Sequence, residues 1–259
     1  MREGAKIVLC TPVMETVQSS FYIDAMRLAQ RMTYLAMKGG PGFSVLTRQS
    51  SNLSDKRHFM VQRVLDDGWA THILWIDSDM TFDQNIAYSL LQYDKPIVAA
   101  ACPTKMVPSF STAVMQRGPS EFAPVDPSQC MGLVPVDFVG LGIALIDVAV
   151  YKTVPPPWFE VVWRPERECY EGEDWYFLRK AKEHGFTPYI DAEASTTVGH
   201  TGSFTFAHGL TYSEGLADER SPLDPPHGEA DGSLLPLGGS SPSSHVSDES
   251  EGGKRNPSH

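Results

Sequence analysis

Residues 72–82 read His-Ile-Leu-Trp-Ile-Asp-Ser-Asp-Met-Thr-Phe, an apolar run that ends in two carboxylates one residue apart. Alternate side chains of a strand lie on the same face, so Asp77 and Asp79 can converge on one ion while residues 73–76 anchor the strand in a core. Carboxylate oxygens suit Mg²⁺ or Mn²⁺, ions that commonly accompany phosphates. The alternative is a polar turn after a buried strand, because turns favour Asp on their own account. The residues downstream decide between the two.

Strand and helix patterns alternate on both sides of this stretch. Before it we expect strands at 6–13 and 43–47 and helices at 17–38 and 54–66. After it we expect a helix at 84–92, a strand at 96–102, loops and short edge strands at 103–135, a buried strand at 136–148, a helix at 173–184 and a final strand region at 187–199. This alternation predicts an α/β fold with a mostly parallel sheet flanked by helices. Ligands of such sheets bind beyond the carboxyl ends of the strands, where Asp77 and Asp79 fall.

Composition divides the chain into a globular part and a tail. The hydrophobic content of 41% is enough for a sizeable core, which we assign to one domain at 1–212. Residues 213–259 are rich in Gly, Ser, Pro, Asp and Glu, and we expect a disordered acidic tail there. Of the net charge of −11, residues 214–259 hold −6, from nine acids and three bases, which leaves −5 for the rest. An acidic body lacks the broad basic face expected of a nucleic-acid-binding protein.

The cysteines and the N-terminus bear on the compartment. The four cysteines have no paired spacing, which argues against a disulfide scaffold or a structural zinc site. Residues 1–8 show neither a long apolar segment nor a small-residue cleavage site. We therefore expect a cytoplasmic protein, in the host cytoplasm if it is viral, with no membrane contact and no obligate protein partner.

Two further motifs carry acids and glycines. Residues 172–177 read Gly-Glu-Asp-Trp-Tyr-Phe and place Glu173 and Asp174 in the first turn of a helix, where the helix dipole favours negative charge. Adjacent helix positions diverge by about 100°, so one of the two is expected to face the site, and Asp174 is the better general-base candidate. Plain N-terminal capping is the alternative. Gly140 and Gly142 interrupt the strand expected at 136–148, where they mark either close approach of a ligand or a bulge.

A late histidine completes the pattern. His200 follows a strand and stands between Gly199 and Gly202, with Thr201 next to it, so its imidazole can come close to a metal or a phosphate. Imidazole can complete a manganese shell begun by carboxylates, although a lone histidine is more often a structural residue.

Taken in order, these motifs resemble the GT-A glycosyltransferases, particularly the small enzymes related to glycosyltransferase family 2 and their viral or phage counterparts. The resemblance covers roughly residues 6–206, and it is carried by residues 73–82, 136–147, 171–185 and 198–200. It implies a GT-A-type, Rossmann-like domain that binds a nucleotide-sugar donor, with UDP or GDP as the nucleotide, and Mn²⁺ or Mg²⁺.

The resemblance also implies roles for single residues. Asp79 would hold the ion on the donor diphosphate, with Asp77 and Ser78 supporting the nucleoside or the metal. His200 would ligate the ion, and Asp174 would deprotonate the acceptor hydroxyl in a transfer with inversion. Thr11, Pro12 and Val13 end the first strand, where such folds hold the nucleobase.

The basic residues Lys56, Arg57 and Arg63 fall on the helix expected at 54–66. They are typical of a solvated helix face, and the alternative is contact with the donor diphosphate, for which Arg57 is our candidate.

Two other functions remain open. The apolar-Asp-x-Asp-x-Thr pattern also fits haloacid-dehalogenase-type phosphatases, in which Asp77 would be a covalent nucleophile. That motif ordinarily ends the first strand of its fold, whereas here two strand-helix units precede it. The second alternative is a non-catalytic sugar-binding protein on the same scaffold.

The acceptor is not identified by the sequence. By analogy with phage enzymes it would be a 5-hydroxymethylpyrimidine in DNA, contacted by basic residues near the expected acceptor loop at 158–172, namely Arg164, Arg167, Arg179, Lys180 and Lys182. The alternative for these residues is a solvated helix face.

Overall fold

The computed structural model describes residues 4–106 and 108–202, so the tail expected at 213–259 lies outside the described residues. In chain order the larger elements are β1 (Lys6–Val13), α1 (Ser19–Met37), β2 (Gly42–Gln49), α2 (Leu53–Asp67), β3 (His72–Ile76), α3 (Ile86–Leu91), β5 (Ile97–Ala99), β9 (Ile143–Asp147), α4 (Val148–Thr153), α5 (Glu173–Glu183) and β12 (Tyr189–Asp191). The shorter ones are β4 (Met80–Thr81), β6 (Val114–Gln116), β7 (Phe122–Pro124), η1 (Pro127–Gln129), β8 (Leu133–Pro135), β10 (Val162–Arg164), β11 (Cys169–Glu171), α6 (Ala192–Ser195) and β13 (Gly199–His200).

One sheet of seven strands organises these elements, in the order β2-β1-β3-β9-β5-β12-β8. The strands β2, β1, β3, β5 and β12 run in one direction, whereas β9 and β8 run against their neighbours. The expected α/β class with a mostly parallel sheet is confirmed. Because β1 and β3 are adjacent and parallel, the carboxyl ends of both lie at one edge of the sheet.

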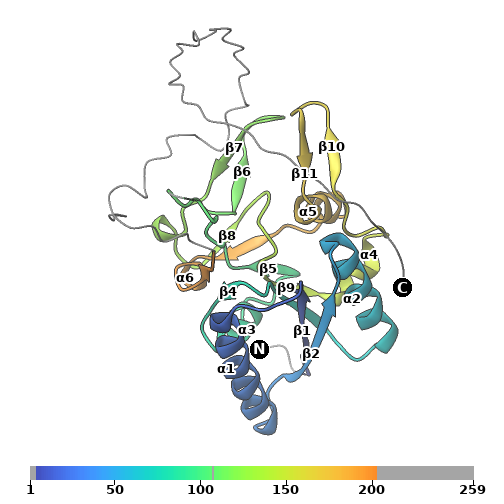
Figure 1. Ribbon diagram of the computed structural model, residues 1–259, viewed down its shortest axis with the longest axis vertical. Helices are drawn as coiled ribbons and strands as arrows, with labels where there is room; N and C mark the ends of the chain where they lie inside the picture. Colours follow the sequence, from blue (N-terminus) through green and yellow to red (C-terminus); the bar gives the residue numbers. More distant parts are fainter. Residues whose placement is uncertain (1–3, 107, 203–259) are drawn as a thin grey trace, which may run out of the picture. The chain divides into compact units, whose positions relative to one another are not determined.

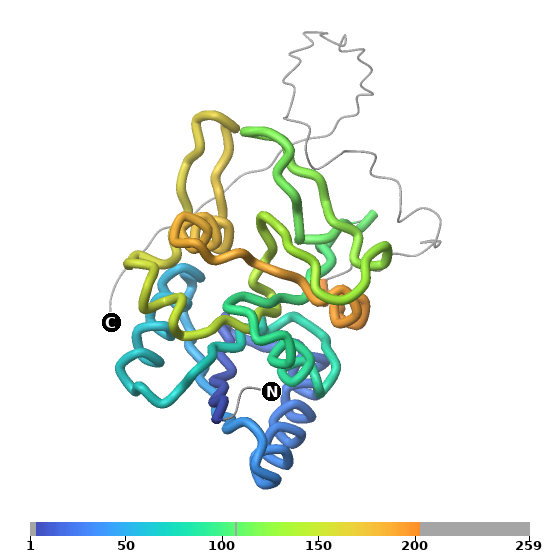
Figure 2. The backbone as a smooth tube through the Cα atoms, turned by 180° about the vertical axis from the view of Figure 1, so that it is seen from behind, coloured from blue at the N-terminus to red at the C-terminus, as the bar shows by residue number. Residues whose placement is uncertain are grey.

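Helices cover both faces of the sheet (Figures 1 and 2). The apolar side chains of β3 alternate between two cores, one on each face. On one face Ile73 and Trp75 of β3 join a core with α2, α4 and α5. On the other face Leu74 and Ile76 join a core with α1 and α3. These four of the five β3 side chains are fully buried, which is why the strand reads as a continuous apolar run and not as an alternating one. It therefore holds the turn that follows it in a fixed position.

Three expected segments differ from the structure. The final strand region expected at 187–199 forms a strand only at β12 and at the start of β13, because α6 interrupts it. The strand expected at 136–148 is regular only at β9, because residues 136–142 fold irregularly over the core and make isolated backbone hydrogen bonds, among them those to Val114 at the start of β6 and to Pro188. The periodicity of buried apolar residues there reflects burial without strand pairing. The segment 158–172, expected as the acceptor loop, begins with the buried Trp158 and continues as the β10–β11 hairpin.

No helix in the described residues is long and apolar enough to cross a membrane.

Candidate functional site

The turn after β3 places the two carboxylates at the carboxyl edge of the sheet. The Asp77 amide donates to the Gly142 carbonyl (2.9 Å), and the Met80 amide donates to the Asp77 carbonyl (3.1 Å), which closes the turn. The chain then enters β4, which pairs with β13 so that Met80 lies opposite His200. Pairing of these short strands therefore brings the late histidine to the Asp-Ser-Asp turn.

Asp79 and His200 meet across this ladder. The Nε2 atom of His200 lies 3.4 Å from Oδ2 of Asp79, and the Thr201 amide donates to the Asp79 carbonyl (2.8 Å). The other ring nitrogen, Nδ1, lies 2.9 Å from the carbonyl oxygen of Pro103. A carbonyl can only accept, so Nδ1 carries the proton and Nε2 faces the carboxylate. An imidazole nitrogen and a carboxylate oxygen therefore face each other, and both are common ligands of divalent cations.

The side-chain chemistry fits a divalent cation at this position. Asp79 and His200 supply one carboxylate and one imidazole, and the carbonyl of Pro103 fixes the imidazole orientation, as is usual for metal-bound histidines. Within 4–106 and 108–202 no group of three His, Cys, Asp or Glu side chains is arranged to hold a metal. Two protein ligands suit Mg²⁺ or Mn²⁺, which keep waters or take phosphate oxygens as their remaining ligands.

A residue without a sequence signal also reaches Asp79. The ammonium of Lys105 lies 2.5 Å from the same Oδ2 atom, with 41% of the Lys105 side chain and 30% of the Asp79 side chain exposed. Lys105 stands in the irregular stretch after β5, 26 residues from Asp79. Only the fold brings the two residues together.

Asp77 is engaged by Arg57 of α2. One guanidinium nitrogen contacts both Asp77 oxygens, at 2.9 and 3.0 Å, and only 2% of the Arg57 side chain is exposed. Burial opposes the charge on Arg57, but the carboxylates of Asp77 and Glu173 more than compensate and raise its pKa. The prediction of a solvated helix face is therefore wrong for Arg57 and for Lys56, which is equally buried. The prediction is confirmed for Arg63, which is exposed. Arg57 positions Asp77, and its contact with a donor stays a prediction.

The acids at the start of α5 lie beside this pair. Glu173 Oε1 is 3.5 Å from Arg57 Nε, so the two carboxylates of Asp77 and Glu173 share one buried guanidinium. Asp174 accepts a hydrogen bond from the Trp175 amide (2.7 Å), and Gly172 caps the helix without a side chain. Burial, followed by the charge of Glu173, raises the pKa of Asp174 to about 7. A carboxyl with that pKa can take up a proton near neutral pH.

The last three residues of β1 are those that the resemblance predicts to hold the nucleoside, Thr11, Pro12 and Val13. Thr11 is 2% exposed, and its Oγ1 is one of the buried polar atoms with no hydrogen-bond partner in the described part of the chain. Pro12 and Val13 follow it, and the Val13 carbonyl accepts from the Lys56 ammonium (3.2 Å). A nucleoside contact at these residues stays a prediction.

Ser78, Gly140 and Gly142 surround the turn. The Ser78 carbonyl accepts from the Gln18 amide at the start of α1 (3.2 Å). A Cβ on Gly142 would lie 3.2 Å from the Cys102 sulfur and 3.4 Å from that of Met80, and one on Gly140 would lie 3.3 Å from Thr112. Both glycines therefore allow close packing around the turn, and their contact with a donor stays a prediction.

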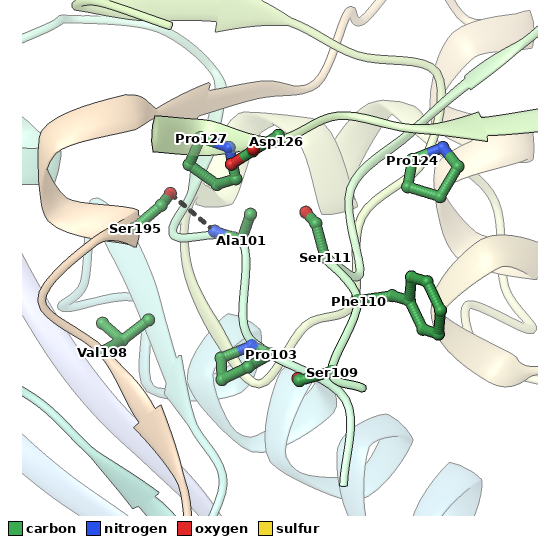
Figure 3. Close-up of a pocket in the computed structure, with 10 residues that line it drawn as sticks. All are labelled: Ala101, Pro103, Ser109, Phe110, Ser111, Pro124, Asp126, Pro127, Ser195 and Val198. Carbon is green, nitrogen blue, oxygen red and sulfur yellow. Dashed lines mark hydrogen bonds between the residues drawn. The ribbon is translucent and has the colours of Figure 1, made fainter. Parts of the chain in front are cut away.

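A cavity of about 400 Å³ adjoins the Asp79–His200 position. It shares Pro103 with the His200 hydrogen bond and reaches Val198, two residues before the histidine. Figure 3 shows Ser195, which is hydrogen-bonded to the Ala101 amide, on one side and the Phe110 ring on the other. The lining contains three serines, one carboxylate (Asp126) and no basic side chain.

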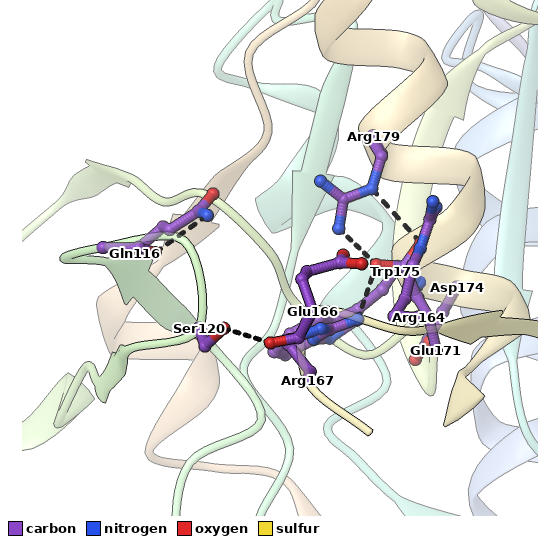
Figure 4. Close-up of polar contacts among 10 residues, drawn as sticks. Gln116, Ser120, Arg164, Glu166, Arg167, Glu171, Asp174, Trp175 and Arg179 are labelled. Carbon is purple, nitrogen blue, oxygen red and sulfur yellow. Dashed lines mark hydrogen bonds and ion pairs between the residues drawn. The ribbon is translucent and has the colours of Figure 1, made fainter. Parts of the chain in front are cut away.

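The basic residues proposed for DNA contact are engaged inside the protein. Arg164, Arg167 and Arg179 all contact the carboxylate of Glu171, which has no exposed surface (Figure 4). Burial opposes the charge on Glu171, but Arg179 and Arg164 lower its pKa below the usual range. The prediction that these three arginines lie on a solvated helix face is wrong, because they connect the β10–β11 hairpin to α5 through Glu171.

The remaining two lysines of that set are engaged as well. Lys182 forms an ion pair with Asp137, and Lys180 donates to the carbonyls of Pro155 (2.6 Å) and Pro157 (2.7 Å).

Sequence reasoning missed Lys105, Glu171 and the partnership of Arg57 with Asp77. Lys105 has no motif around it, and Glu171 adjoins the Gly-Glu-Asp motif without a signal for its own role. A basic residue inside the apolar stripe of α2 was the available signal for Arg57, since a charge on a buried face needs a partner.

No protein-family model and no curated protein matches the sequence. Among solved structures, the chain is similar to a protein from STIV, with 12% identity and a TM-score of 0.46 over 79% of this chain and 100% of that chain. It is also similar to Drosophila β1,4-galactosyltransferase 7 with manganese, UDP-Gal and xylobiose, with 13% identity and a TM-score of 0.44 over 85% and 84% of the two chains. A third is GalNAc-T7 with UDP, GalNAc and Mn²⁺, with 10% identity and a TM-score of 0.49 over 80% of this chain and 45% of that chain.

With TM-scores below 0.5, these likenesses do not by themselves fix the fold or the activity. The fold rests on the chain's own sheet order and on the place of Asp77 and Asp79 at its carboxyl edge. These confirm the α/β fold with a mostly parallel sheet that the sequence predicts, while the GT-A type stays a prediction.

Proposed function

We propose that this protein is a metal-dependent glycosyltransferase that moves a sugar from a nucleotide-sugar to an acceptor hydroxyl with inversion. The observation that carries the proposal is the meeting of Asp79 and His200 at the carboxyl edge of a mostly parallel sheet, with Nδ1 of the histidine tied to a carbonyl. Ligands of such sheets bind at this edge.

The residues would divide the chemistry as follows. Asp79 and His200 would hold Mn²⁺ or Mg²⁺, which when bound supplies positive charge to the departing diphosphate. Asp77, held in place by Arg57, would support the nucleoside or the metal. Asp174 would accept the proton of the acceptor hydroxyl, because its raised pKa suits a general base near neutral pH. Thr11 to Val13 would line the nucleoside of a UDP or GDP donor.

For the acceptor we propose an uncharged, hydroxyl-bearing molecule such as a saccharide, bound in the cavity beside His200. The volume of the cavity lies within the roughly 300–1,000 Å³ of small-molecule sites. Serine hydroxyls and the Asp126 carboxylate suit hydroxyl groups, and the Phe110 ring suits the apolar face of a sugar. DNA is the weaker candidate, because the five basic side chains suggested for phosphate contact are engaged by carboxylates and carbonyls.

The phosphatase alternative is less compatible with this geometry. Both oxygens of Asp77 contact the Arg57 guanidinium, and this ion pair lowers the nucleophilicity of the carboxylate. The motif also ends the third strand along the chain and not the first.

Mass spectrometry of reactions with UDP- and GDP-sugars, with and without Mn²⁺, tests the proposal. Saccharides and hydroxymethylcytosine DNA serve as acceptors in parallel. We expect Asp79→Ala to lose Mn²⁺-dependent donor binding, and Asp174→Asn to keep donor binding but lose transfer. Equal loss of both properties in each variant would contradict the assigned roles. Phosphate release from a simple phosphomonoester without turnover of any sugar nucleotide would support the phosphatase. Absence of both activities, together with sugar binding, would support a non-catalytic protein.

A further inference from the structure

Lys105 lies at Oδ2 of Asp79, the oxygen that faces His200, where a cation held by both Asp79 and His200 would sit. Its ammonium lies 2.5 Å from Oδ2 of Asp79, the same oxygen that Nε2 of His200 approaches at 3.4 Å. A lysine ammonium and a divalent ion cannot share one carboxylate oxygen at these distances without strong repulsion. Loading of the ion therefore requires Lys105 to leave Asp79.

The surroundings of Lys105 permit that movement. With 41% of its side chain exposed, the ammonium keeps contact with water, and its departure opens no hole in either core. The aliphatic stem of Lys105 runs past Gly202, where an added Cβ would lie 3.8 Å from its Cδ. His200 does not need to follow, because its ring is held from the other side by the Pro103 carbonyl.

The displaced ammonium needs a new anion. A diphosphate that arrives with the ion brings more than one negative charge to the same edge of the sheet, and a charge-assisted hydrogen bond to phosphate is stronger than one to a neutral group. We propose that Lys105 is an exchangeable counter-ion, which neutralises Asp79 before loading and moves to the donor diphosphate when the metal binds.

This exchange makes the metal and the donor bind cooperatively. Metal alone must displace the lysine without compensation, whereas metal together with a diphosphate gives the lysine a new partner. By linkage the donor must raise metal affinity by the same factor as the metal raises donor affinity. The donor half of this inference rests on the proposed function, whereas the competition at Asp79 does not.

Mn²⁺ binding tests the competition, measured by electron paramagnetic resonance of the free ion without nucleotide. The variant Lys105→Met keeps the aliphatic stem and removes the charge. We expect it to bind Mn²⁺ on the order of 2- to 5-fold more tightly than the wild type, which is the effect of removing a partly exposed ion pair. Lys152→Met, on the exposed last turn of α4, is the matched control and should leave the affinity unchanged.

Repeating the titration with UDP or GDP tests the exchange. In the wild type the nucleotide should raise Mn²⁺ affinity, and this gain should shrink in Lys105→Met and persist in Lys105→Arg, which keeps the charge. Equal or weaker Mn²⁺ binding by Lys105→Met without nucleotide, or no Mn²⁺ binding by either protein, would overturn the proposal. If neither nucleotide binds the Mn²⁺-loaded wild type, the proposed function fails, and the transfer of Lys105 to the diphosphate fails with it. Tighter Mn²⁺ binding by Lys105→Met would in that case still establish that Lys105 and the metal compete for Asp79.

Discussion

Replacing Asp174 with asparagine should abolish transfer and at the same time stabilise the protein above neutral pH. The carboxyl is half-buried beside Glu173, and its pKa rises from 3.8 to about 7. The folded protein therefore holds a proton on Asp174 that the unfolded chain releases. The stability this proton provides is present below about pH 4 and is lost as the pH rises through about 7. Asparagine resembles the protonated form and can still accept from the Trp175 amide.

The size of the effect follows from the pKa shift. At 1.36 kcal/mol for each pH unit, the shift corresponds to roughly 4 kcal/mol as an upper bound. Water reaches part of the side chain and screens its charge, so we expect about 1–2 kcal/mol at pH 8. For a domain of this size that gain would raise the melting temperature by roughly 2–8 °C.

Thermal melts of the wild type and Asp174→Asn at pH 5 and pH 8 provide the measurement. The stability gap should be larger at pH 8 than at pH 5, because at pH 5 the wild-type carboxyl is still protonated in the folded state. Asp66→Asn, at an exposed position on α2, is the matched control and should give a small gap that does not depend on pH. A variant no more stable than the wild type at pH 8 would refute the buried, proton-holding carboxyl.

Three further outcomes test the site and its supports. Arg57→Met should lower the free energy of unfolding by about 3–5 kcal/mol in urea titrations, because Asp77 loses its buried partner. Arg63→Met on the same helix is the control and should change the free energy of unfolding little. Equal effects of the two variants would contradict the role of the Arg57–Asp77 pair. Glu171→Gln should speed proteolytic cleavage within 162–171, because three arginines lose their shared carboxylate. Glu168→Gln, at an exposed position, is the control. Equal cleavage rates of the two variants would show that the Glu171 cluster does not hold the hairpin. Phe110→Ala should raise the acceptor KM about 2- to 10-fold and leave the donor KM unchanged, with Tyr88→Ala as the surface control; a change in the donor KM instead would place the donor in the cavity.

Much of the fold could be predicted because its signals are local. The strand at 6–13 was predicted to the residue, and the helices around α1, α2 and α5 to within two residues at each end, since apolar periodicity, Gly172 and Gly185 mark them directly. Prediction failed at 136–142 and at 158–172. In both stretches the buried residues pack against distant parts of the chain, and burial alone does not distinguish a strand from an irregular segment or a hairpin from a loop.

The amino-acid sequence by itself determined that two carboxylates end a buried strand, that another pair opens a helix and that a histidine follows late in the chain, because each motif is a local pattern. The tertiary structure decided how these groups are used. It turned Asp77 toward a buried arginine, left Asp79 facing His200, and placed Lys105 on the same oxygen. These roles depend on contacts between residues that are 20 to 121 positions apart in the sequence. The packing of β3, α2 and β13 brings the opposite charges together, and no local sequence pattern predicts that packing.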